Sequence, residues 1–274
     1  MFELPLLNTI ILLSSGKHYC QKCDKFLRFY SKLSNLLKIT ESKSSFYEEL
    51  SESSDTSNID ALPLGSPEVR GINRIGPHAQ HIYSIIFGSL LGDGIMVKEK
   101  GGSRMMFYQS EGHSDYLLWL HSELSKWGYC LKTPPVLRSR VFKDGKIGYF
   151  MRFESFTYTS FNWIWEEFYP KGRKVVPLCI TDYLTPLALA IWAMVDGCKL
   201  KNKGFKFAKN SFTLKETKFL ADILNKKYKL KVSIIKTGAV NQYNIYIIKS
   251  SMDTFIEIVK PHMHSSIIYK LYDL

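Results

Sequence analysis

The sequence of 274 residues has no apolar run of the length that a membrane span requires. Its apolar stretch at residues 4–13 is shorter than the roughly 20 residues of a spanning helix, and Asn8 and Thr9 interrupt it. An acid at position 3 and the absence of early Lys or Arg also argue against a secretory signal peptide. We therefore expect neither a membrane span nor a leader.

Cysteine is scarce as well, with five residues scattered along the chain. An odd, scattered set does not predict a disulfide scaffold and is typical of a reducing compartment. Cys20 and Cys23 have the spacing of a metal-binding pair, but no second Cys/His pair of suitable spacing lies near them. This argues against a structural zinc site.

Acidic residues are too few to balance the basic ones, and the net charge is +12. Residues 1–76 carry nine residues of each sign, whereas residues 77–274 carry 28 Lys/Arg and 16 Asp/Glu. Such an excess favours a phosphate-bearing partner, which is nucleic acid or, less often, an anionic membrane, although it can also serve solubility alone. Residues 40–69 are rich in Ser and acids, so we expect residues 1–76 to be an extension ending in a flexible linker.

From residue 77 the sequence contains an internal repeat. Periodicity and turn signals predict the same order of elements twice. In the first copy these are an apolar helix at 85–96 that ends in Asp-Gly, a loop, a strand at 103–110, a helix at 114–128, strands at 136–142 and 147–154, and a helix at 160–168. In the second copy they are a helix within 187–200, a loop, a strand at 204–211, a helix at 214–228, strands at 230–236 and 242–248, and a helix at 252–260.

Several positions support these helices. Thr185 suits the cap and Pro186 the first turn of the second apolar helix. The helix at 114–128 is expected to bury one face, and the helix at 214–228 likewise. These faces consist of Leu117, Leu120, Leu124 and Trp127 in the first case and of Phe219, Leu220, Ile223 and Leu224 in the second.

The two apolar helices are thinned by small residues, among them Gly88 and Gly92 in the first and three alanines in the second. Small residues allow close helix packing, which would bring Asp93 and Asp196 together. Two carboxylates at negative helix ends repel each other. A divalent cation removes this repulsion, and Mg²⁺ held by paired acids is suited to phosphodiester hydrolysis. For either copy alone, Asp-Gly can simply be a helix stop.

The segments "IFGSLLGDG" and "LAIWAMVDG" resemble the two motifs of the LAGLIDADG homing endonucleases, in the single-chain, two-repeat form encoded by organellar group I introns. The resemblance covers residues 77–274 and extends to "YLTPLALAIW", "NSFT" and "NQYNIYI". It implies an α+β fold of duplicated αββαββα halves, 77–180 and 181–274, with pseudo-twofold symmetry. Two curved antiparallel sheets would then form a DNA-binding saddle.

The resemblance also implies the roles of six residues. The last acid of each motif binds the catalytic Mg²⁺, a basic residue from each repeat assists, and polar residues at the strand ends order water. The matching positions are Asp93 and Asp196 for the metal, Lys174 in "KVVP" and Lys270 in "IIYKL" for the basic residues, and Gln109 and Asn210 for water.

The motifs also depart from the family pattern at four positions. An earlier motif acid is absent from both copies, at Leu91 and Met194. Val195 stands where an acid often precedes the metal-binding one, and Ile191 replaces the central glycine of the second motif. The two key acids remain, so we still expect a metal site.

Alternation along the strands predicts a recognition surface. Arg138 and Arg140 share a face opposite Leu137 and Val141, and a strand in such a sheet buries one face while it presents the other. Arg, Gln and Asn suit purine edges, and lysines suit phosphates; a plain solvent-exposed polar face is the alternative. The expected DNA-binding residues are Arg104, Arg138, Arg140, Arg152, Lys199, Lys201, Lys203, Lys206, Lys231, Ser233, Lys236, Gln242, Asn244 and Tyr246.

Taken with the resemblance, these patterns predict a Mg²⁺-dependent endonuclease that cuts each strand of a double-stranded DNA site once. The alternatives are an RNA maturase that binds its group I intron and assists splicing, with or without nuclease activity, and a DNA-binding protein without activity. We expect a monomer, because both halves of the site lie in one chain. Arginine accounts for only eight of the 37 basic residues, which indicates AT-rich coding and, with the resemblance, a mitochondrion or another organelle.

Overall fold

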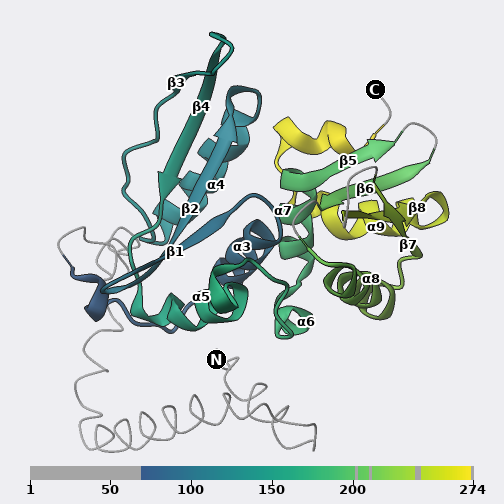
Figure 1. The fold of residues 1–274 in the computed structure, drawn as a ribbon, viewed down its shortest axis with the longest axis horizontal. Helices are drawn as coiled ribbons and strands as arrows, with labels where there is room; N and C mark the ends of the chain where they lie inside the picture. The colour runs from purple at the N-terminus through teal and green to yellow at the C-terminus, as the bar shows by residue number, and fades with distance from the viewer. Residues whose placement is uncertain (1–68, 201–202, 210–211, 238–241, 273–274) are drawn as a thin grey trace, which may run out of the picture. The chain divides into compact units, whose positions relative to one another are not determined.

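The computed structural model describes residues 69–200, 203–209, 212–237 and 242–272 (Figure 1). All of them belong to one compact unit, Ala61–Leu274. The linker predicted over 40–69 lies outside the described residues except for its last position, and Lys201 and Asn210 also lie outside them. In the described part of the chain, no helix combines the length and the apolar character needed to cross a bilayer.

Two sets of elements follow one another in the same order. The first set is α3 (Gln80–Leu91), β1 (Ile95–Glu99), β2 (Gly102–Ser110), α4 (Ser114–Lys126), β3 (Arg138–Val141), β4 (Ile147–Glu154) and α5 (Asn162–Phe168). A short helix, α6 (Ile180–Tyr183), connects it to the second set. The second set is α7 (Pro186–Asp196), β5 (Gly197–Leu200), β6 (Gly204–Lys209), α8 (Leu214–Tyr228), β7 (Val232–Lys236), β8 (Tyr243–Ile248) and α9 (Met252–Val259), after which a 3₁₀ segment covers Ser265–Leu271.

Each set forms a four-stranded antiparallel sheet, in the orders β1-β2-β4-β3 and β5-β6-β8-β7. The sheets lie on either side of α3 and α7 (Figure 1). This confirms the duplicated αββαββα fold. The loops predicted directly after the two Asp-Gly pairs were wrong, because these residues form β1 and β5, which continue the sheets at the edge of β2 and β6.

The two motif helices end differently. Helix α7 ends at Asp196 as predicted, whereas α3 ends at Leu91, before Asp93. Gly92 leaves the helical conformation, with φ −95° and ψ −142°. The N–H groups of Gly92 and Gly94 both donate to the carbonyl of Ser89, at 3.0 and 2.9 Å. Asp93 is therefore the exposed tip of a tight turn.

The helices α3 and α7 pack against each other through the glycines of α3. A methyl group added at Gly88 would lie 2.5 Å from the carbonyl oxygen of Ala188 and 2.8 Å from Cβ of Ile191. One added at Gly92 would lie 2.7 Å from Cγ1 of Val195. The close approach expected from small residues is confirmed. Gly88 lies against Ala188 and Ile191, and the later Gly92 lies against the later Val195. The two helices are therefore parallel.

The core joins both halves and is rich in aromatic rings. Trp192 of α7 stacks on Phe207 of β6, with ring centroids 4.0 Å apart, and Phe207 in turn meets Phe255 of α9. The predicted cap of α7 is confirmed, because the Thr185 side chain accepts from the N–H of Ala188 and Pro186 occupies the first turn. These contacts pack α7 against the second sheet.

The burial predictions fail at two places in the first half. Trp127 is 43% exposed, because α4 ends at Lys126 and the Trp127 ring instead contacts His81, with the two ring planes tilted by 54°. Leu137 and Val141 are 43% and 68% exposed. Val141 pairs with Ile147 next to the β3–β4 turn, whereas Leu137 directly precedes β3, which is the edge strand of the sheet.

Candidate metal and nucleic-acid site

Asp93 and Asp196 lie at the same end of the α3–α7 pair. The residues just before them, Gly92 and Val195, are in contact, so the two acids leave the paired helices side by side. Asp93 is exposed and Asp196 is half-buried. Because the helices are parallel, both negative helix ends also meet here. The arrangement concentrates negative charge where a cation would bind.

Lys174 supports the turn that carries Asp93. Its Nζ donates to the carbonyl oxygens of Gly92 and Gly94, at 2.8 and 2.7 Å. Burial lowers the pKa of Lys174 to about 8, and the negative charge of Asp93 partly opposes this shift. The lysine therefore contributes positive charge directly beneath the first acid.

Lys270 occupies the equivalent place in the second half. Its Nζ donates to the carbonyl oxygens of Met194 and Val195, at 2.5 and 3.4 Å, at the end of α7. Burial lowers its pKa, while Cys198 and Asp93 act in the opposite direction. Because Asp93 belongs to the first half, its charge acts on the lysines of both halves.

The donors present suit a hard cation that also binds substrate oxygens. The described residues hold no group of three or more His, Cys, Asp or Glu side chains that could enclose a metal. Mg²⁺ does not need one, since it commonly uses one or two carboxylates and completes its shell with water and phosphate oxygens. The carboxylates of Asp93 and Asp196 fit this requirement in number and kind.

Gln109, at the end of β2, lies in a chain of polar contacts that the sequence did not predict. Its Oε1 accepts from Nδ1 of His113 at 3.3 Å, and Nε2 of His113 lies 3.2 Å from the hydroxyl of Tyr269. Burial lowers the pKa of His113, and the charge of Lys270 lowers it further. His113 thus lies beside the site, although nothing in its sequence context indicates this.

The four arginines expected to contact DNA in the first half share one face of its sheet. The register pairs Tyr108 with Arg152 and Phe150 with Arg138, and paired residues point to the same side. Arg104 and Arg140 follow by alternation. Arg104 also forms ion pairs with Glu99 and Glu154, at 2.9 and 3.3 Å, so its charge is largely balanced.

The second sheet presents a similar polar face. Lys206 and Ser233 both pair with Tyr246, and Asn244 lies on the same side. By alternation Lys231 and Gln242 extend this face at the strand ends, and Lys203 lies in the β5–β6 turn. Lys199 and Lys236 instead pair with Phe205 and Tyr243, so they lie on the side of the apolar core residues.

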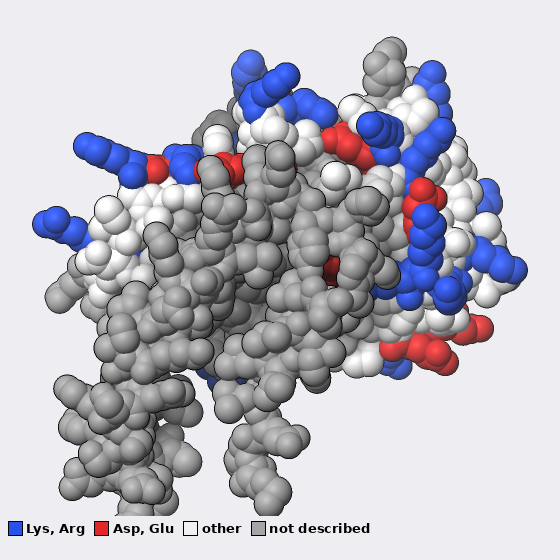
Figure 2. Space-filling view, turned by 90° about the horizontal axis from the view of Figure 1, so that it is seen from below, with Lys and Arg blue, Asp and Glu red and all other residues white. Residues whose placement is uncertain are grey.

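Basic side chains gather on the described surface beyond the site. On the face seen in Figure 2, blue Lys and Arg side chains lie along the upper and right-hand edges, with smaller groups of red Asp and Glu side chains among them. This agrees with the net charge of +12. A surface of this sign attracts polyanions.

Two yeast proteins are similar to this chain over most of the described region. The cytochrome b mRNA maturase bI2 of Debaryomyces hansenii is 43% identical over 73% of this chain and 77% of its own length. The protein of the same name from Saccharomyces cerevisiae is 45% identical over 73% of this chain. This chain spans only about half of the Saccharomyces protein, 49% of its length.

This chain also matches a solved structure and a sequence model of a protein family. A solved structure of the homing endonuclease I-WcaI bound to its DNA recognition sequence superposes with a TM-score of 0.66, covering 73% of this chain and 89% of that one at 24% sequence identity. The likeness supports the fold. The sequence model of the LAGLIDADG DNA endonuclease family matches residues 83–255. With both motif acids at the junction of the two repeats, this chain belongs to the LAGLIDADG DNA endonuclease family.

Proposed function

We propose that this protein is a site-specific endonuclease that hydrolyses one phosphodiester in each strand of a DNA duplex. The observation that carries the proposal is the pair of acids at the joined ends of α3 and α7, each with a half-buried lysine beside it. Residues 77–180 and 181–274 are the two repeats, and each contributes one acid and one lysine. The protein acts as a monomer.

Asp93 and Asp196 would hold Mg²⁺, which supplies Lewis-acid polarisation of the phosphate and activation of a water molecule. Lys174 and Lys270 place positive charge next to the acids, where it stabilises charge that develops on the phosphate in the transition state. Gln109, and Asn210 in the second repeat, orient water through their amides. In this proposal the acids bind the metal, the amides orient water and the lysines stabilise negative charge.

The polar faces of the two sheets would bind one half-site each. Arginines 138, 140 and 152 line the first face, and Lys206, Asn244 and Tyr246 lie on the second. Their hydrogen-bonding groups suit base edges, while lysines at the strand ends suit phosphates. Recognition and catalysis are thereby separated between the sheets and the helix ends.

The test is cleavage of a duplex that spans the intron-minus insertion site, with Mg²⁺, by the wild type and by Asp93→Asn and Asp196→Asn. We expect the wild type to cut both strands and each variant to lose activity by about 10³-fold or more, since a metal ligand is removed. Asp222→Asn, on the exposed side of α8, is the matched control and should cut normally. Loss in neither variant would contradict a shared metal site.

A second function, RNA maturation, is favoured by the two yeast relatives, whose names describe maturases of cytochrome b mRNA. We propose as the alternative that this chain binds its group I intron RNA and assists splicing, and that it acts in the mitochondrion. Self-splicing of the intron transcript at low Mg²⁺, with and without the protein, tests this. Faster splicing by Asp93→Asn as well as by the wild type would show that maturation does not need the metal site.

A further inference from the structure

We infer that each active-site lysine is positioned by the repeat to which it does not belong: Glu216 positions Lys174, and His113 positions Lys270. The inference rests on the proposed endonuclease function. Glu216 lies in the first turn of α8 and His113 directly precedes α4. These helices are equivalent in the two repeats, so the same device occurs twice.

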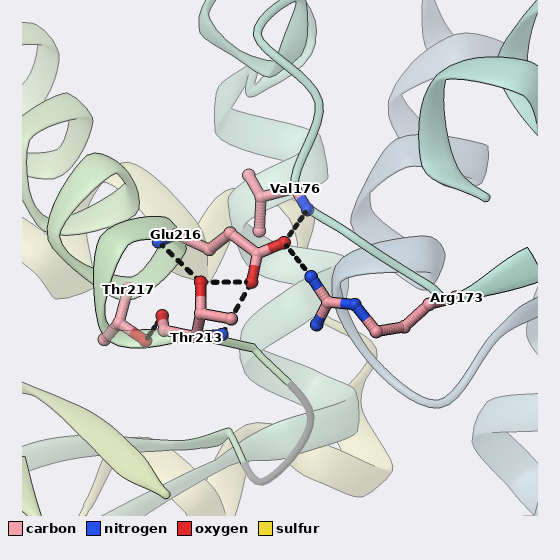
Figure 3. Close-up of polar contacts among 5 residues, drawn as sticks. All are labelled: Arg173, Val176, Thr213, Glu216 and Thr217. Carbon is pink, nitrogen blue, oxygen red and sulfur yellow. Dashed lines mark hydrogen bonds and ion pairs between the residues drawn. The ribbon is translucent and has the colours of Figure 1, made fainter. Parts of the chain in front are cut away.

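The carboxylate of Glu216 is held firmly by its own helix end (Figure 3). Its Oε2 accepts from the N–H and the hydroxyl of Thr213, both at 2.6 Å, and the Thr213 hydroxyl accepts from the N–H of Glu216. This is a capping box, which satisfies the free N–H groups of a helix start. One oxygen of Glu216 is thus fully engaged within α8.

The other oxygen reaches the first repeat. Oε1 of Glu216 accepts from the backbone N–H of Val176 and from Nη2 of Arg173, both at 3.3 Å (Figure 3). The Glu216 side chain is only 13% exposed, so water competes little for these contacts. Arg173 is 55% exposed, so the backbone contact to Val176 carries most of the effect.

These two contacts flank Lys174. The segment from Arg173 to Val176 is also tied to its own repeat, through the N–H of Val175 and the carbonyl of Phe168 at 2.7 Å. Glu216 fixes the segment from the other side. A lysine side chain has many rotamers, and a fixed backbone lets its Nζ meet the carbonyls of Gly92 and Gly94 beneath Asp93.

His113 makes the corresponding connection to Lys270. Its Nε2 contacts the hydroxyl of Tyr269, the neighbour of Lys270, while Nδ1 contacts Gln109 of its own repeat. A second contact supports the same segment, because Trp119 of α4 stacks on His264 with centroids 5.6 Å apart. The C-terminal segment that carries Lys270 is therefore held by His113, directly before α4, and by Trp119 within α4.

Glu216→Gln is the sharpest test of the first half of the inference. A glutamine at this position of a capping box still accepts from Thr213. Its amide NH₂ then faces the N–H of Val176 and the guanidinium of Arg173, which are all donors. On a duplex carrying a different label on each strand, we expect single-turnover cleavage of one strand to slow by about 10- to 100-fold, with normal cleavage of the other and nicked DNA accumulating.

Thr213→Ala is the matched control, because it removes the capping hydroxyl and leaves the contacts to Val176 and Arg173. We expect a lower melting temperature but the wild-type ratio of strand cleavage rates. DNA affinity, measured in EDTA with a labelled duplex, should be the same for the wild type, Glu216→Gln and Thr213→Ala. Equal slowing of both strands by Glu216→Gln would show a structural role and overturn the inference.

Tyr269→Phe and His113→Ala test the second half. Tyr269→Phe removes only the hydroxyl that His113 contacts, and both variants should slow the strand that Glu216→Gln spares. The effect should be smaller than for Glu216, since Tyr269 is 43% exposed. Unchanged rates, or slowing of the same strand as Glu216→Gln, would overturn the crossed arrangement. A wild type that cuts neither strand would instead overturn the endonuclease function.

Discussion

The positive charges of Lys174 and Lys270 reduce the repulsion between the two acids, as a bound cation would. Each donates to carbonyl oxygens at the end of a motif helix, where positive charge is favourable. Asp93 and Asp196 can therefore lie close together before any metal binds. The cost is the desolvation of two lysines, which is why the pKa of each is lowered.

His78 is a buried base of a different kind, because its two ring nitrogens contact neutral hydroxyl groups and not a carboxylate. Its Nδ1 lies 2.7 Å from the hydroxyl of Tyr129, and its Nε2 lies 2.6 Å from Oγ of Ser160. Burial lowers its pKa to about 4. Since an imidazole in an unfolded chain has a pKa near 6.5, folding keeps His78 neutral where the unfolded chain is protonated.

We predict that His78 makes the protein less stable in mild acid. Between pH 6.5 and about 4 the unfolded chain binds the proton and the folded chain does not, so stability falls as the pH falls through this window. The loss should be about 2 kcal/mol between pH 7 and pH 5. Denaturant unfolding of the wild type and of His78→Gln at both pH values measures it. A variant with the full pH dependence of the wild type would contradict the prediction.

At the residue scale, sequence reasoning reached some positions of the candidate site and missed others for identifiable reasons. The resemblance pointed to Lys174 and Lys270, and the structure places both beside the acids. Glu216 was visible as the last member of a Thr-x-x-Glu pattern, but its contact with Val176 depends on the tertiary fold. His113 carries no local signal, because its partner Tyr269 is remote in sequence.

The packing of α3 on α7 depends on the absence of a side chain at Gly88. A Cβ there would lie 2.5 Å from a backbone oxygen, which cannot move aside as a flexible side chain could. We predict that Gly88→Ala lowers the free energy of unfolding by about 1–3 kcal/mol or more through overpacking. Thermal or denaturant unfolding measures this.

Gly112→Ala is the control for Gly88→Ala. A Cβ at Gly112 meets no atom within 4 Å, so the substitution should leave stability close to that of the wild type. If both variants lost the same stability, the effect would arise from the change of glycine itself and not from the helix contact.

At the element scale, periodicity identified the long helices and the hairpins, because their apolar positions repeat over several turns or strand residues. It missed β1 and β5, which span only Ile95–Glu99 and Gly197–Leu200. Such short strands directly after Asp-Gly are indistinguishable from a loop until β2 and β6 supply their partners. The predicted burial of Leu137 and Val141 was wrong for a related reason: alternation does not show that a strand lies at the edge of its sheet.

The net charge of the whole molecule predicts that the proposed binding to DNA depends on salt. We predict that the association constant falls steeply and linearly with salt on a double logarithmic plot, as counterions leave the duplex. Arg140→Ala should weaken binding, and it should reduce the slope by about 1 if Arg140 contacts a phosphate. Fluorescence anisotropy at several salt concentrations, in EDTA, measures both.

Lys126→Ala, at the end of α4 on the helical side of the first sheet, is the control for Arg140→Ala. It should leave both the affinity and the slope nearly unchanged. If the two variants weakened binding equally, the polar face of the first sheet, which carries Arg140, would not be the DNA-binding surface.

For the whole molecule, the sequence was most informative about the duplication, because two equivalent motifs with similar downstream spacing are visible without any structure. The identical order of the two sheets confirms it. The relation between the repeats was less accessible. Contacts such as Glu216 to Val176 cross from one repeat to the other, and no pattern within either repeat reports them.

The contact between the motif helices has a consequence for the history of the two repeats. Gly88 and Ile191 stand five residues before Asp93 and Asp196, and Gly92 and Val195 stand one residue before them. At each of these equivalent positions a glycine in one repeat now receives a larger side chain from the other. If two copies of α3 were paired in this way, glycine would face glycine and leave voids. If two copies of α7 were paired, Ile191 and Val195 would collide with their own counterparts. One repeat therefore cannot replace the other in this contact. A substitution at one of these positions must be compatible with the residue that it contacts in the other repeat.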